Sequence, residues 1–315
     1  MISVLRLPPA LEPGARVGVA ALSGPIDRGR LEAGLEGLIR LGYEPVPAAN
    51  LTSRHRFFAG SDDERLAAFH ELAADPSLGA IFFARGGHGV LRLLGSIDWG
   101  LLAGRPRFYV GYSDLTPFLD QVVRRLGLVA VHGPMVAVEL ADGLGETESE
   151  ALLAVLAHRL PIEIPLPAPW RGPTIEGRLV GGCLSMLVAT LGTPFQIDCR
   201  DALVFWEDTG EPPYRLDRMA TQLRLSTASD GIRGLLVGAF EAPSPGSDWT
   251  DRDLSALIPE LEREWQLPVA CGVPSGHGRP NYALPLGPTA RLEEGSGVLI
   301  VGLPVAPGAA EPEPT

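Results

Sequence analysis

The sequence contains no lysine, so all 26 of its basic side chains are arginines. The absence of a primary amine excludes several chemistries: a Schiff base with pyridoxal phosphate or a carbonyl substrate, a P-loop lysine on nucleotide phosphates, and a Ser–Lys dyad. Basic residues are also outnumbered by the 38 acidic ones, and the 315-residue chain has a formal net charge of −12. We therefore expect neither nucleic acid nor a membrane surface as a partner, since both attract a basic face.

Cysteines are few, and metal-binding patterns are missing. Cys183, Cys199 and Cys271 are widely spaced in apolar stretches, which predicts buried thiols in a reducing compartment. Neither C-x-x-C nor H-E-x-x-H occurs, so we expect no metal and no cofactor. The sequence begins without a signal-peptide pattern and has no apolar run of membrane-spanning length, which favours a cytoplasmic location.

The first half of the chain alternates short apolar segments with amphipathic ones. Strands are predicted at residues 16–22, 43–47, 79–84 and 105–110, and helices at 31–42, at 62–74 and from about Thr116. This alternation predicts an α/β fold with an N-terminal open, mostly parallel sheet flanked by helices. Ligands of such sheets bind at the carboxyl ends of the strands, where Ser23, Arg85 and Ser113 fall.

A proline-rich segment separates this pattern from a different one. Residues 161–175 are predicted as a linker, because they are rich in proline and lack a helical pattern. Beyond it, extended stretches alternate with helical patterns at 181–191, 214–225 and 251–265. We therefore predict an N-terminal domain over 1–160, a smaller β-rich C-terminal domain over 176–305, and a disordered tail over 306–315.

A strand-to-helix corner is predicted at residues 108–114, FYVGYSD. A serine at such a corner is lifted clear of the sheet and faces the free amides of the helix start, as a nucleophile requires. The match to the G-x-S-x-G elbow is partial, because Leu115 stands where that pattern has glycine. The residues alone leave a second interpretation open, namely an ordinary turn in which Ser113 or Asp114 caps the helix.

A serine nucleophile needs a base and a carboxylate that orients the base. His277 lies between two glycines, which leave its imidazole uncovered; His88 and His132 are further candidates. Acids follow the apolar stretch 202–206, but its pattern does not separate Glu207 from Asp208.

The segment ARGGHG at residues 84–89 follows another predicted strand. Its three glycines let backbone amides face a ligand, which suits an oxyanion hole if Ser113 is nucleophilic. A phosphate-binding turn or a flexible loop is the alternative, although neither G-x-G-x-x-G nor the P-loop pattern matches.

Five motifs in this order resemble the LD-carboxypeptidase family of serine peptidases, which also contains microcin C self-immunity hydrolases. They are ARGGHG with RLL (84–89 and 92–94), GYSD (111–114), VGG (180–182), WED with EPPYRLDR (206–208 and 211–218), and GHG with Asn281 and LPLG (276–278 and 284–287). The resemblance covers residues near 17 to 303, essentially the whole folded chain.

The resemblance implies a role for each motif. Ser113 is the expected nucleophile, His277 the base and Glu207, rather than Asp208, the orienting acid, with backbone amides near Gly87 and Asp114 as oxyanion donors. The resemblance further implies a triad assembled across two domains, a homodimer and no metal. The chain departs from the family pattern at His88, where tyrosine is usual, and at Cys183, where asparagine is usual.

We therefore expect a cytoplasmic serine carboxypeptidase that cleaves an amide next to a free carboxylate, with release of the terminal D-alanine of murein tetrapeptide in cell-wall recycling favoured. Arg85, His88 and Trp206 are candidate substrate contacts, with Arg85 as the carboxylate clamp because lysine is absent and the planar guanidinium suits that task. One alternative is a microcin C-type hydrolase of peptidyl or aminoacyl sulfamoyl adenylates, for which Trp170 or Trp206 could supply an aromatic contact. The other is a non-catalytic small-molecule binding protein.

Overall fold

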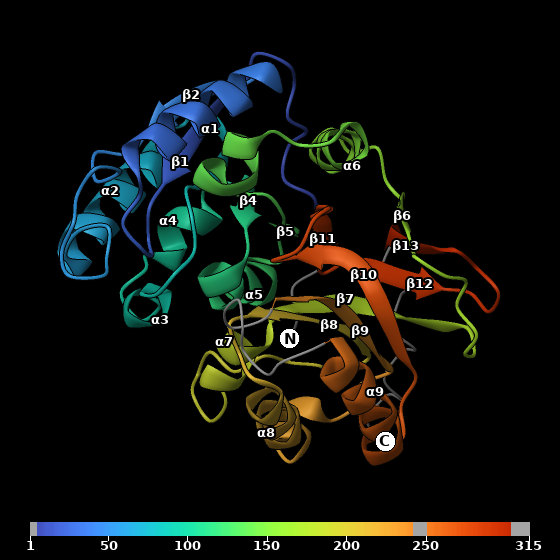
Figure 1. Ribbon diagram of the computed structural model, residues 1–315. Helices are drawn as coiled ribbons and strands as arrows, with labels where there is room; N and C mark the ends of the chain where they lie inside the picture. The colour runs from blue at the N-terminus through green and yellow to red at the C-terminus, as the bar shows by residue number, and fades with distance from the viewer. Residues whose placement is uncertain (1–4, 242–250, 304–315) are drawn as a thin grey trace, which may run out of the picture.

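The computed structural model describes residues 5–241 and 251–303, so the tail predicted at 306–315 lies outside the described residues. The described chain forms two sheets, each covered by helices (Figure 1). In Figure 1 the strands and helices of the N-terminal half run from blue to green, β11 joins their sheet in orange-red, and most of the second sheet lies below in yellow to red. This is the predicted α/β fold class. Within the described ranges, no helix is both long enough and apolar enough to span a membrane.

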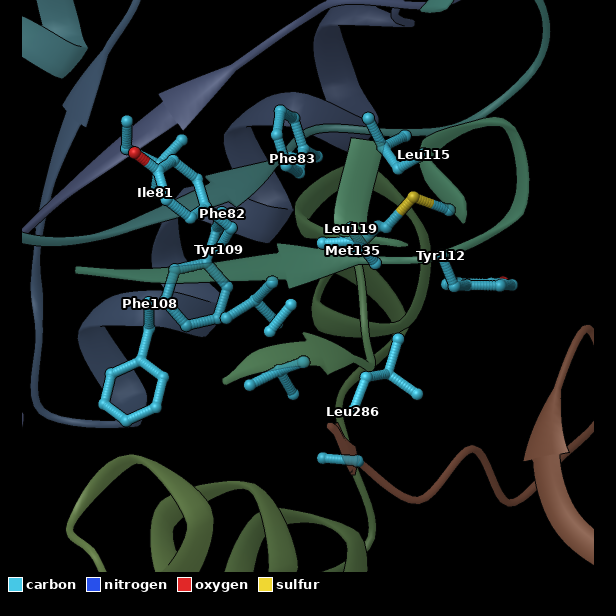
Figure 2. Packing of buried hydrophobic residues seen from close by; sticks show 14 of the residues in the cluster. Ile81, Phe82, Phe83, Phe108, Tyr109, Tyr112, Leu115, Leu119, Met135 and Leu286 are labelled. Carbon is cyan, nitrogen blue, oxygen red and sulfur yellow. The ribbon is translucent and has the colours of Figure 1, made fainter. Parts of the chain in front are cut away.

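The first sheet has six strands in the order β11-β5-β4-β3-β1-β2. The five strands from the N-terminal half are parallel, and β11 is antiparallel to β5. The strands are β1 (Arg16–Ala20), β2 (Glu44–Pro47), β3 (Leu78–Phe83), β4 (Phe108–Gly111), β5 (Ala130–His132) and β11 (Leu284–Leu286). Strands β3 and β4 lie in the middle of this sheet, and Figure 2 shows Phe82 of β3 and Tyr109 of β4 within the hydrophobic core.

Two helices of the first half illustrate capping signals in the sequence. Ser61 and Glu64 form a capping box at the start of α2, and Gly127, at φ 60°, ends α5 in a left-handed conformation. The helices are α1 (Arg28–Arg40), α2 (Asp62–Ala74), α3 (Val90–Leu93), α4 (Trp99–Ala103), α5 (Thr116–Leu126) and α6 (Glu146–Leu156), with short turns η1 (Ser113–Leu115) and η2 (Val136–Leu140).

The second sheet has seven strands in the order β10-β9-β8-β7-β12-β13-β6. Strands β7 to β10 are parallel to one another. The pairs β7–β12, β12–β13 and β13–β6 are antiparallel, so the second sheet is mixed. The elements are β6 (Ile162–Pro165), β7 (Ile175–Cys183), α7 (Leu184–Ala189), β8 (Ala202–Thr209), α8 (Pro213–Arg224), η3 (Thr227–Ser229), β9 (Gly234–Glu241), α9 (Asp251–Trp265), β10 (Val269–Gly276), β12 (Thr289–Leu292) and β13 (Val298–Leu303).

Two segments depart from the predicted division of the chain. The segment 161–175 is not only a linker, because its strand β6 pairs with β13 at the edge of the second sheet. Buried Ile162 and Ile164 alternate there with exposed residues, and an edge position tolerates the prolines that led us to expect a linker. Strand β11, from the C-terminal half, completes the first sheet beside β5 (Figure 1). The two halves are therefore interlocked.

Helix α1 fixes the position of η2 through close backbone packing. A Cβ atom added at Gly34 would lie 1.9 Å from the Val136 carbonyl oxygen, and one at Gly37 would lie 2.4 Å from that of Leu140. Any side chain larger than hydrogen at these two positions therefore forces the helix away from η2.

We expect Gly34→Ala to lower the free energy of unfolding by about 1–3 kcal/mol or more, because α1 must move away from η2. Urea or thermal unfolding measures this change. Gly104→Ala is the matched control, since its added Cβ would lie 3.6 Å from its nearest neighbours, an ordinary contact. A wild-type unfolding midpoint for Gly34→Ala would contradict the packing described here.

Candidate active site

Ser113 occupies a strained corner between β4 and α5. Its φ is 62°, in the left-handed region that residues other than glycine rarely adopt. The chain leaves the sheet after Gly111, makes the single turn η1 and continues directly into α5. This geometry presents a partly exposed serine hydroxyl at the carboxyl end of a central strand.

His277 reaches Ser113 from the other half of the molecule. It follows the last residue of β10, and its Nε2 lies 3.0 Å from the Ser113 Oγ. The glycine before it has a packing role: a Cβ at Gly276 would lie 2.6 Å from the Cβ of Glu207. The flanking glycine predicted to uncover the imidazole therefore also lets the backbone approach the acid.

Glu207 lies on the other side of the imidazole. Its side chain is 0% exposed, and its Oε2 lies 2.5 Å from His277 Nδ1 and accepts the His277 backbone N–H at 3.2 Å. Because a carboxylate only accepts hydrogen bonds, Nδ1 donates to it, and Nε2 is left to accept a proton from the serine hydroxyl. Ser113, His277 and Glu207 thus form a continuous hydrogen-bonded line.

Asp208, which the strand pattern could not separate from Glu207, has different partners. Its Oδ2 accepts the Ser185 backbone N–H at 2.7 Å, and its Oδ1 accepts the Thr209 N–H at 2.8 Å. The carboxylate therefore fixes the start of α7 and does not bond to the imidazole.

Two histidines near the site differ in electrostatic environment: His277 is partly buried and His132 is fully buried. Burial lowers the pKa of His277, but the carboxylates of Glu207, Asp208 and Glu241 together outweigh it, with Glu207 foremost, so the pKa lies above the ordinary value of 6.5. Burial lowers the pKa of His132 to about 3, and no carboxylate offsets it. His132 packs between Tyr112 and Phe205, with ring centroids 5.3 and 5.1 Å away. His132 is therefore a neutral core residue and, contrary to expectation, not a base.

The segment ARGGHG at residues 84–89, called the glycine-rich turn below, lies directly against Ser113. A Cβ at Gly86 would be 2.8 Å from the Oγ of Ser113. The Gly86 carbonyl accepts the Gly24 N–H at 3.2 Å, so the N–H of Gly87, on the opposite side of the same trans peptide, points away from Gly24. Gly87 has φ 121°, a conformation that favours glycine. Within the described residues, the N–H groups of Gly87 and Asp114 have no protein acceptor.

The side chain of Asp114 joins the loops that surround this corner. It is 1% exposed, and its Oδ2 accepts the Ser23 hydroxyl at 2.7 Å and the Val90 N–H at 3.0 Å. These bonds connect the end of β1, the start of α3 and the serine corner. Asp114 therefore holds the glycine-rich turn against Ser113.

The three predicted substrate contacts are placed differently. Arg85 is exposed beside the glycine-rich turn and donates to the carbonyls of Gly86 at 3.3 Å and Pro25 at 3.2 Å. His88 is exposed and stacks on Phe58, with centroids 5.6 Å apart. Trp206 was wrongly expected at the substrate: it is 1% exposed in the core of the second half, because it points to the opposite face of β8 from Glu207.

Sequence reasoning also missed features and misjudged one cysteine. Cys271 is exposed, although the apolar segment around it predicted burial. The sequence predictions also miss buried Glu139, although a lone acid within an apolar run is a signal for such a residue. Within the described ranges, no group of three or more His, Cys, Asp or Glu side chains is arranged to hold a metal ion.

Comparison with known protein families assigns a class to this architecture. The LD-carboxypeptidase N-terminal domain matches residues 17–133, and the LD-carboxypeptidase C-terminal domain matches residues 176–292. The chain belongs to the LD-carboxypeptidase family.

Individual relatives extend the match over nearly the whole chain. A probable murein peptide carboxypeptidase of Bacillus subtilis is 34% identical, covering 96% of each chain. The crystal structure of muramoyltetrapeptide carboxypeptidase from Oxalobacter formigenes has a TM-score of 0.80 at 28% identity, covering 92% of this chain and 100% of that one. The microcin C7 self-immunity protein MccF of Escherichia coli is 25% identical, covering 87% of this chain and 89% of that protein.

The coupling of His277 to Glu207 can be measured without any substrate. We expect the pKa of His277 to lie above 6.5 in the wild type and to fall in Glu207→Gln, because the carboxylate that raises this pKa most is then removed while burial remains. NMR titration of the histidine ring signals reports both values. Glu163→Gln, at an exposed position of β6, is the control and should leave the titration unchanged. The same His277 pKa in Glu207→Gln and wild type would contradict the coupling.

Proposed function

We propose that this protein is a serine carboxypeptidase that hydrolyses an amide bond next to a free carboxylate, with the terminal D-alanine of murein tetrapeptide as the favoured leaving group. The line from Ser113 Oγ to His277 Nε2 at 3.0 Å and from Nδ1 to Glu207 at 2.5 Å is the observation that carries this proposal. Relatives named as murein peptide carboxypeptidases support the substrate class. The proposal includes a cytoplasmic site of action and a homodimer.

The proposed reaction proceeds through an acyl-enzyme. His277 removes the Ser113 proton as the hydroxyl attacks the scissile carbonyl, and Glu207 stabilises the resulting imidazolium. The N–H groups of Gly87 and Asp114 stabilise the oxyanion, an effect worth roughly 3 kcal/mol for each donor. His277 then protonates the leaving amine, and water, activated by the same imidazole, hydrolyses the ester.

The substrate carboxylate needs a cationic partner, which in a chain without lysine must be arginine or histidine. Arg85 is our candidate, because its guanidinium is exposed next to the glycine-rich turn that contacts Ser113. A planar guanidinium can bind both carboxylate oxygens at once, which suits selection for a terminal residue.

A second candidate function is hydrolysis of peptidyl or aminoacyl sulfamoyl adenylates. Similarity to the microcin C7 self-immunity protein MccF supports it. Burial of Trp206 removes one aromatic contact that this function would use, but Phe57 is 57% exposed and lies 5.8 Å from His88, beside the glycine-rich turn. Mass spectrometry after incubation with murein tetrapeptide and with an aminoacyl sulfamoyl adenosine separates the two candidates.

Ser113→Ala should reduce turnover of murein tetrapeptide by roughly 10⁴-fold or more, because no other group can form the acyl-enzyme. Release of D-alanine measured by mass spectrometry tests this, and Ser149→Ala on α6 is the control. Wild-type turnover by a folded Ser113→Ala protein would refute the mechanism. Absence of turnover by the wild type on either substrate would favour a binding protein.

Gly86→Ala should slow labelling of Ser113 by a fluorophosphonate about tenfold or more, because the added Cβ would lie 2.8 Å from the serine Oγ and displace it. Gly95→Ala is the matched control, since nothing lies within 4 Å of its added Cβ. Equal labelling rates in these two variants would contradict the close contact between the turn and the serine.

A further inference from the structure

A buried carboxylate outside the line of Ser113, His277 and Glu207 collects three hydrogen bonds. Glu139, on η2, is 3% exposed. Its Oε1 accepts the Tyr112 hydroxyl at 2.6 Å and the Asn281 side-chain amide at 3.3 Å, while its Oε2 accepts the Met135 backbone N–H at 2.9 Å. Tyr112 and Asn281 come from different halves of the chain, so Glu139 joins the two halves at this point.

Both partners of Glu139 lie next to residues that react in the proposed mechanism. Tyr112 immediately precedes Ser113, and its ring packs edge-on against His277 with centroids 4.9 Å apart. Asn281 Oδ1 accepts the backbone N–H of Gly276, the residue before His277, at 2.9 Å. One carboxylate therefore restrains both the serine corner and the loop that carries the base.

The carboxylate is itself held firmly by the N-terminal half. Arg30 of α1 donates to the carbonyls of Ala137 at 3.0 Å and Val138 at 2.7 Å, and α1 packs closely against η2 at Gly34. On the C-terminal side, Asn281 N–H donates to Glu148 of α6 at 2.7 Å. The loop after His277 is thus bound to a fixed platform rather than to another loop.

The residue types at these positions follow from the direction of each hydrogen bond. A carboxylate only accepts, which suits Glu139 because three donors converge on it. Asn281 must donate from one end of its amide and accept at the other. An aspartate at 281 would place a second carboxylate against Glu139 in a buried site, where like charges repel strongly.

We propose that Glu139 is a positioning residue that, through Tyr112 and Asn281, holds the His277 loop against the Ser113 corner. This inference rests on the proposed function of Ser113 as a nucleophile. Because Glu139 does not touch the reacting atoms, its loss should change the alignment of serine and imidazole and leave the substrate-binding groups in place. A misalignment of about 1 Å is enough to cost on the order of 100-fold in rate.

Three variants test the proposal in the full-length protein: Tyr112→Phe, Glu139→Gln and Asn281→Ala. We expect kcat to fall roughly 10- to 100-fold with KM little changed, and the rate of fluorophosphonate labelling at Ser113 to fall in parallel. In the Tyr112→Phe/Glu139→Gln double variant, the fold-decrease in kcat should be smaller than the product of the decreases in the two single variants. Both substitutions act on the same hydrogen bond, between the Tyr112 hydroxyl and Glu139. Glu150→Gln, at an exposed position on α6, is the control and should behave as wild type.

Hydrogen exchange of the segment 275–282 gives a readout that does not need turnover. Exchange should become faster in Asn281→Ala, which removes the acceptor of the Gly276 N–H, and in Glu139→Gln, which weakens the bond that holds the Asn281 side chain in place. Tyr112→Phe removes a single oxygen and keeps the ring. If the other two variants fail to fold, its kcat and labelling rate still test the proposal.

The possible results separate the two claims. Wild-type kcat and labelling in all three variants would overturn the positioning role while leaving the proposed function intact. A loss of kcat without faster exchange would also overturn it, because Glu139 would then act directly. If the wild type is neither labelled at Ser113 nor active, the proposed function fails, and unchanged exchange in the variants would then remove the positioning role as well.

Discussion

The contact of 3.0 Å between Ser113 Oγ and His277 Nε2 requires that the two halves of the chain be fixed relative to each other. Its two residues lie 164 positions apart and follow strands of different sheets, β4 and β10. No local preference brings such residues together, so the two halves must be fixed relative to each other. Strand β11 does this in the backbone, because it pairs with β5 of the first sheet. The bonds of Glu139 and Glu148 to Asn281 do the same through side chains.

Electrostatics and packing support the same arrangement. Glu207 is fully buried, and a buried carboxylate is costly unless a partner compensates for its lost hydration. His277 is that partner, through its ring and its backbone N–H. Glu207 and the loop that carries His277 therefore stabilise each other. The close approach at Gly276 makes this short distance possible. The Glu207–His277 contact therefore also contributes to the stability of the second half, whose sheet carries both residues.

Much of the secondary structure of the first half could be predicted from local patterns in the sequence. The alternating segments of the first half predicted β1, α2, β3 and α5, because propensity and capping signals agree there. The short strands β5, β6 and β11 escaped prediction, since each is stabilised mainly by pairing with a distant strand. Motif order pointed to Ser113, Glu207 and His277, but the burial of Trp206 and the role of Glu139 depend on which face of an element meets the core.

The most direct test of the central claim is the site of covalent labelling by a fluorophosphonate, mapped by peptide mass spectrometry in the wild type and in His277→Ala. The account predicts that the wild type carries one label, on Ser113, and that His277→Ala is labelled far more slowly, because only the paired imidazole activates this hydroxyl. Labelling on another residue, or equally fast labelling of Ser113 without the histidine, would contradict a nucleophile activated across the two halves.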